Sequence, residues 1–118
     1  MNKLTNKEEQ IMQVLWKLKA AFVKEIVQEL PEPKPHYNTV STTIRKMETK
    51  GYIKHKDFGS TYQYLPAIAQ DDYRSSTVST TLKNYFDNSY KEMVSHFAQE
   101  EKISVKELKE IIKMIESK

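Results

Sequence analysis

The sequence of 118 residues predicts a mainly α-helical protein with a single β-hairpin. Apolar residues recur at helical spacing in segments on both sides of the hairpin, as in amphipathic helices. Between residues 52 and 65 the pattern changes to alternation, and this segment is rich in tyrosine and β-branched residues, which favour strands. The chain has only two glycines, one expected to follow a helix and one expected in the hairpin turn.

The first helix is expected to begin at Thr5 and to end near Lys19. Thr5 and Glu8 have the spacing of a capping box, in which each side chain accepts a hydrogen bond from the other residue's backbone N–H. Trp16 lies beside the apolar stripe and is expected to be partly buried. The stripe itself consists of Ile11, Val14, Leu15 and Leu18.

A second helix is expected over residues 23–30. Prolines at positions 31, 33 and 35 stop it, because proline lacks the backbone N–H that a helix interior needs. The preceding Ala20-Ala21-Phe22 is either a linker or a very short strand. The third helix begins with Asn38 as its N-cap, and Gly51 follows its end as a left-handed residue.

The spacing within the third helix predicts which residues face inward. Val40, Ile44 and Met47 define its buried face, and Thr43 is expected to be half-buried. The exposed or flanking positions then belong to Thr39, Ser41, Thr42, Arg45 and Lys46.

The hairpin is predicted to turn over Asp57-Phe58-Gly59-Ser60, with Ile53 and His55 on one face of its first strand and the lysines at 54 and 56 on the other. Three more helices are expected after it, over 72–86, over 90–98 and after a second capping box formed by Ser104 and Glu107. This order predicts a winged helix-turn-helix domain over residues 1–68, in which the hairpin is the wing, and a helical domain over residues 69–118.

The third helix and the wing carry the residues that favour DNA binding. Short hydroxyl side chains let a helix approach the major groove, where they and arginine can contact bases or phosphates. Residues 34–64 hold 6 Lys and Arg against 2 Asp and Glu, a local charge of +4, which favours a polyanion but also fits ordinary solvated lysines. The predicted DNA contacts are Asn38, Thr39, Ser41, Thr42, Arg45, Lys46, Lys54, Lys56 and Ser60.

Other classes of function receive less support. The three histidines have no spacing typical of a zinc site, and the chain has no cysteine, phosphate-binding loop or nucleophile motif. We therefore expect no enzyme, no cofactor and no metal. A winged helix that binds another protein instead of DNA stays an alternative. The cytoplasm is the expected location, since no apolar run approaches a membrane span.

Three segments of the sequence resemble those of a known family. "IMQVLW" near the start and "TVSTTIRKMETKGYI" in the third helix, followed by "G-x-x-Y-x-Y", are similar to the penicillinase repressors of the BlaI, MecI and CopY type. The resemblance covers nearly the whole chain. It implies a homodimeric transcriptional repressor of the antibiotic-resistance type, whose winged helices bind a palindromic operator.

The resemblance also implies that the C-terminal helices form the dimer, although their apolar stripes could instead pack within the chain. The predicted dimer residues are Tyr85, Phe86, Met93, Val94, Phe97, Leu108, Ile111, Ile112 and Ile115. In β-lactam-responsive relatives a membrane-bound sensor protease cleaves an Asn–Phe bond. The matching pair here is His96–Phe97, the candidate cleavage site, and Ser41 stands where the family often has arginine.

Overall fold

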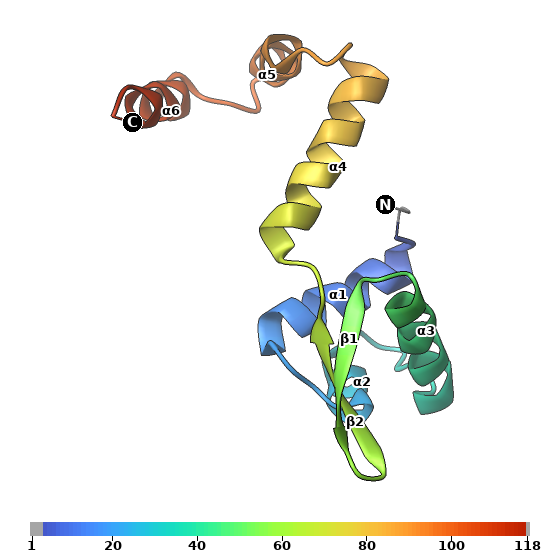
Figure 1. Cartoon of the computed structure of the whole chain (residues 1–118). Coiled ribbons are helices and arrows are strands. Elements are labelled where there is room, and N and C mark those ends of the chain that lie inside the picture. Colours follow the sequence, from blue (N-terminus) through green and yellow to red (C-terminus); the bar gives the residue numbers. More distant parts are fainter. Residues whose placement is uncertain (1–3, 118) are drawn as a thin grey trace. The chain divides into compact units, whose positions relative to one another are not determined.

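The computed structural model describes residues 4–117 and contains six helices and one hairpin within them (Figure 1). The chain forms two compact units that divide between Tyr73 and Arg74, inside a helix, whereas the sequence predicts a boundary before that helix. The elements are α1 (Asn6–Leu18), α2 (Val23–Glu29), α3 (Tyr37–Thr49), β1 (Ile53–Phe58), β2 (Thr61–Pro66), α4 (Gln70–Tyr85), α5 (Tyr90–Gln99) and α6 (Val105–Glu116).

The start of α1 confirms the predicted capping box. The Glu8 N–H donates to Thr5 Oγ1 at 3.2 Å, and the Thr5 N–H donates to Glu8 Oε1 at 2.9 Å. Behind this start, the apolar stripe of α1 joins the inner faces of α2 and α3 and the base of the hairpin in one core. Its fully buried large side chains are Tyr52, Met12, Leu15, Ile26, Ile44 and Met47.

Helix α3 begins earlier than the sequence predicts. His36 is its N-cap, without a side-chain capping bond, and the Val40 N–H already bonds to the His36 carbonyl at 3.1 Å. Asn38 therefore lies in the first turn and is not the N-cap. A capping preference of about 1 kcal/mol is too weak to fix a helix boundary by itself. Gly51 follows the helix with the expected positive φ of 91°.

The hairpin is longer than predicted, and its turn is shorter. Asp57 pairs with Tyr62 and Phe58 pairs with Thr61, so the loop is only Gly59-Ser60 rather than four residues. Gly59 has a φ of 76°, which suits the first position of a two-residue hairpin loop. The tight loop lets the ladder continue through two residues that the sequence assigns to the turn.

A short β-bridge decides between the two alternatives for Ala20-Ala21-Phe22, a linker or a very short strand. The Ala21 N–H donates to the Tyr64 carbonyl at 2.9 Å, and the Tyr64 N–H donates to the Ala21 carbonyl at 2.8 Å. This bridge places the α1–α2 connection against the outer edge of β2. The base of the wing is thereby fixed to the helical core.

The C-terminal unit contains most of α4 with α5 and α6. Asp87 and Asn88 adopt positive φ values of 49° and 62° and end α4, and Ser89 caps α5 by accepting from the Glu92 N–H. The second capping box, Ser104 with Glu107, is confirmed. Among the described residues from 74 to 117, only Leu82 is buried. Nowhere in residues 4–117 is a helix both long and apolar enough to span a membrane.

Candidate nucleic-acid interface

The inner face of α3 agrees with the predicted face. Val40, Ile44 and Met47 are buried, and Thr43 is half-buried. On the outer side, the exposed residues among those predicted to contact DNA are Asn38, Thr39, Thr42, Arg45 and Lys46. The helical period therefore fixes the rotation of α3, because core burial of one stripe exposes the opposite one.

Ser41 is the exception, since the structure buries it to 8% exposure although the sequence predicts it on the exposed side. Its hydroxyl accepts a hydrogen bond from Arg45 Nη2 at 3.1 Å. The guanidinium that contacts it comes from the next turn of the same helix. Ser41 thus contacts the guanidinium rather than solvent.

The threonine hydroxyls of α3 are used within the helix. Thr42 Oγ1 donates to the Asn38 carbonyl at 2.9 Å, and Thr43 Oγ1 donates to the Thr39 carbonyl at the same distance. Bonds of this kind satisfy the hydroxyl proton and leave the hydroxyl oxygen as an acceptor. Thr42, which is exposed, therefore presents an acceptor and a methyl group on its outer side.

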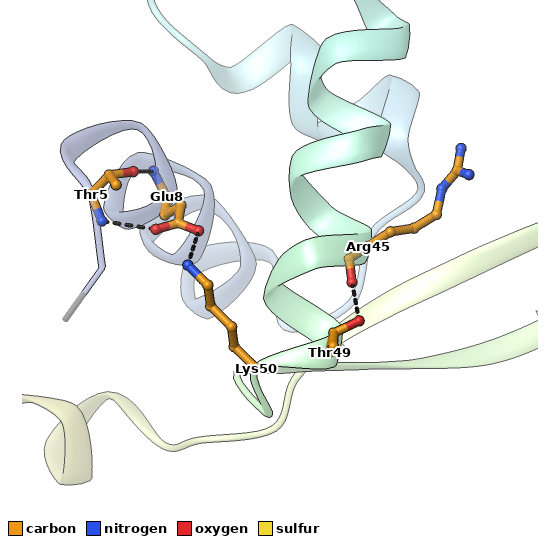
Figure 2. Close-up of polar contacts among 5 residues, drawn as sticks. All are labelled: Thr5, Glu8, Arg45, Thr49 and Lys50. Carbon is orange, nitrogen blue, oxygen red and sulfur yellow. Dashed lines mark hydrogen bonds and ion pairs between the residues drawn. The ribbon is translucent and has the colours of Figure 1, made fainter. Parts of the chain in front are cut away.

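Arg45 extends from α3 away from the start of α1 (Figure 2). Its backbone carbonyl accepts from Thr49 Oγ1 at 3.1 Å, one turn further along. The arginine borders an open cleft of about 840 Å³ between the start of α2, the outer side of α3 and β2. Aromatic side chains from all three elements line this cleft beside the cations Lys24 and Arg45; they are Phe22, Tyr37, Tyr62 and Tyr64.

The far end of α3 is anchored to α1 by an ion pair. Lys50 Nζ lies 3.1 Å from Glu8 Oε2, while the other oxygen of Glu8 accepts from the Thr5 N–H (Figure 2). Burial would raise the pKa of Glu8, but the hydrogen bond from Thr5 and the ammonium of Lys50 together hold that pKa below its usual value. Sequence reasoning found the capping box but not this pair, because the partners are 42 positions apart.

The wing presents two different faces. Lys54 and Lys56 are exposed on one face, and the turn residue Ser60 is exposed at the tip. On the other face His55 pairs with Tyr64 across the ladder, and Tyr64 is buried against the core. The predicted alternation is thus confirmed, and the lysines lie on the face of the hairpin opposite to Tyr64.

His55 has contacts that its place in the predicted first strand does not reveal. Its Nδ1 contacts the carboxylate of Glu48 in α3, and its ring stacks on Tyr62. Burial, followed by the negative charge of Glu48, raises the pKa of Tyr64. These contacts join residues of different elements and follow no fixed local spacing, so the sequence pattern does not reveal them.

The predicted dimer residues lie mainly on uncovered surface of the C-terminal unit. Phe86, Met93 and Leu108 are half-buried. The rest are exposed, by 38% at the lowest and 78% at the highest; they are Tyr85, Val94, Phe97, Ile111, Ile112 and Ile115. The candidate cleavage pair, His96 and Phe97, lies inside α5.

Comparison with known proteins extends the resemblance over the whole described chain. The sequence profile of the penicillinase repressor family matches residues 4–117. The penicillinase repressor of Bacillus licheniformis is 24% identical over 114 residues, which cover 96% of this chain and 89% of the relative. The penicillinase repressor of Staphylococcus aureus is 29% identical over 102 residues, covering 86% and 81%.

A solved structure of H. salinarum RosR shares the fold. It superposes with a TM-score of 0.54 at 17% identity and covers 85% of this chain and 94% of that one. The three helices and hairpin described above confirm the predicted winged helix-turn-helix class. Because the family profile matches nearly every described residue, the chain belongs to the penicillinase repressor family, whose members are transcriptional repressors and not enzymes.

Proposed function

We propose that this protein binds DNA sequence-specifically as a homodimer on a palindromic operator and represses transcription there. The observation that carries the proposal is the outer side of α3, where Thr39, Thr42, Arg45 and Lys46 are exposed opposite a fully buried apolar stripe. Membership of a repressor family supports DNA as the partner. A DNA target also implies the cytoplasm as its location.

The chemistry of this outer side suits the major groove. Thr42 offers an acceptor and a methyl group, which can meet a base amino group or the methyl group of thymine. Arg45 keeps donors free beyond its bond to Ser41 and can bond a guanine edge. Lys46, one position further, is suited to a phosphate. Asn38 and Thr39 lie at the start of α3, where free backbone N–H groups favour phosphate.

The wing contributes charge rather than base recognition. Lys54 and Lys56 are exposed on the face opposite to the core, and Ser60 lies at the tip. Long cationic side chains on a projecting hairpin suit the sugar–phosphate backbone beside the groove. We therefore assign them to affinity and its salt dependence, and we assign α3 to sequence preference.

The C-terminal unit supports the proposal of a dimer, since it buries only Leu82 among its described residues. Helix α6 is strongly amphipathic, yet Ile111, Ile112 and Ile115 on it are exposed in the single chain. A second copy of the same unit, with the same stripes, is the partner whose apolar surface matches. Two copies would also place two α3 helices on the two half-sites of a palindrome.

The names of the relatives, penicillinase repressor and methicillin resistance regulatory protein, suggest a resistance gene as the regulated target. They also suggest that a membrane-bound sensor protease releases the repressor from DNA by cutting the His96–Phe97 bond. That bond lies inside α5, so cleavage there would first require local unwinding of the helix. Incubation with a candidate sensor, followed by mass spectrometry, tests whether the chain is cut after His96.

The experiment that tests the proposal is a gel-shift titration at rising salt on duplexes recovered by random-sequence selection. DNA binding predicts a palindromic product and an affinity that falls steeply with the logarithm of salt concentration, because bound cations leave the DNA. No binding to any duplex, or binding that ignores salt, would instead favour the alternative, a winged helix that binds a protein.

A further inference from the structure

Glu48 and His55 form a contact between α3 and the wing that the proposed DNA contacts do not use. Glu48 is near the end of α3, and its Oε2 contacts Nδ1 of His55 in β1. The two side chains are 30% and 32% exposed, respectively. The pair is thus partly shielded from water, which makes it stronger than a fully exposed pair.

The ring of His55 is also held by the neighbouring strand. It stacks on Tyr62, with ring centroids 4.2 Å apart and an angle of 20° between the planes. It meets Tyr64 edge to face at 6.0 Å, and Tyr64 is itself buried and bridged to Ala21. His55 therefore links α3, β1 and the anchored strand β2 through one side chain.

The outer part of the wing has little burial of its own. In β1 only Ile53 is buried, and the five residues after it are exposed. On the opposite face Phe58 meets Phe22 edge to face, with centroids 5.7 Å apart. The position of the outer part of the wing against α3 thus depends on a few side-chain contacts, and one of them is that of Glu48 with His55.

We propose that Glu48 and His55 are positioning residues, which hold the wing against α3 and thereby support DNA affinity. This inference rests on the proposed DNA-binding function.

Loss of either side chain removes this contact between α3 and the wing. We therefore expect the attachment of the wing and the DNA affinity to weaken together.

Hydrogen exchange in the free, full-length protein tests the attachment directly. The β1 amides are followed at pH 6 in the wild type, in Glu48→Gln, in His55→Gln and in the double variant. We expect exchange about two- to fivefold faster in each single variant and no further increase in the double variant. Exchange that stays at the wild-type rate would overturn the proposal.

The consequence for DNA is measured with the same four proteins on the selected duplex. Loss of either charge changes the general attraction to DNA, and the double-mutant cycle removes these separate effects. We expect a non-additive factor in Kd of about two- to fivefold. Additive effects would overturn the role in DNA binding.

A matched cycle uses Lys56→Gln with Glu48→Gln. Lys56 lies on the opposite face of the wing, so its effect should add to that of Glu48. The two proposals can fail separately. If the wild type binds no duplex, the proposed function is wrong, and unchanged hydrogen exchange in a protein that does bind DNA refutes only the positioning role.

Discussion

The two units of this chain differ in how far they bury their apolar residues. All the buried apolar residues of the described chain except Leu82 belong to the N-terminal unit, where three helices and the base of the wing enclose them. Helices α5 and α6 of the C-terminal unit also carry apolar stripes, but most residues of these stripes are exposed or half-buried. We therefore expect the N-terminal unit to be stable by itself and the C-terminal unit to gain stability from a partner surface.

The sharpest test of this difference is an identical truncation in each unit. Ile44→Ala removes a side chain with 0% exposure and should lower the free energy of unfolding by about 2–5 kcal/mol. Ile112→Ala removes a side chain that is 53% exposed in the single chain and should change the stability of a dilute monomer little. Urea unfolding followed by circular dichroism measures both. Equal losses would contradict the comparison.

Charging the exposed stripe tests whether a second copy covers it. Ile112→Glu should give monomers in sedimentation equilibrium and weaken binding to a two-half-site duplex by about a hundredfold, because the half-sites are no longer bound together. Lys113→Glu, on the neighbouring polar side of α6, is the control and should leave the dimer intact. A dimer that survives Ile112→Glu would mean that the stripe packs elsewhere.

Within the N-terminal unit, variants of Arg45 and Ser41 test the proposed base recognition and the support that Ser41 gives to the guanidinium. Arg45→Ala should cost about 1–3 kcal/mol of operator binding and relax the preference at one base position. Ser41→Ala, which removes the acceptor of the guanidinium, should relax the same position by less. Binding measured on a set of single-base operator variants checks both. An equal loss on every variant would reassign Arg45 to a phosphate.

The ion pair that anchors α3 predicts a dependence of stability on pH. Because the pKa of Glu8 is lowered in the folded state, its contribution is present above the ordinary value of 4.5 and is lost as the pH falls through the folded-state pKa. Glu8→Gln should cost about 1–2 kcal/mol at pH 7 and little at pH 3. Glu29→Gln, in an exposed pair with Lys17, is the matched control and should cost almost nothing.

The smallest expected effect belongs to the wing lysines. Lys54→Ala and Lys56→Ala should each reduce the slope of log affinity against log salt by about 1, without a change in sequence preference. Gel shifts at several salt concentrations measure the slope. An unchanged slope would remove the exposed face of the wing from the DNA interface.

Local patterns predicted much of the fold and part of the candidate interface. The capping boxes of Thr5 with Glu8 and of Ser104 with Glu107 are confirmed, since both partners lie within one turn. The outer side of α3 was predicted correctly at Thr42 and elsewhere, but not at Ser41. A serine beside the edge of an apolar stripe is buried or exposed according to what packs next to it, and the helical period alone does not say.

The order of the elements, the inner face of α3 and the family could be predicted from the chain alone, because each depends on residues close together in the chain or on the pattern as a whole. The pairing of Lys50 with Glu8, the bridge between Ala21 and Tyr64 and the contact of His55 with Glu48 became visible only with the packed elements. Contacts of this kind depend on how separate elements pack, and a periodic pattern records only which side of each element faces inward.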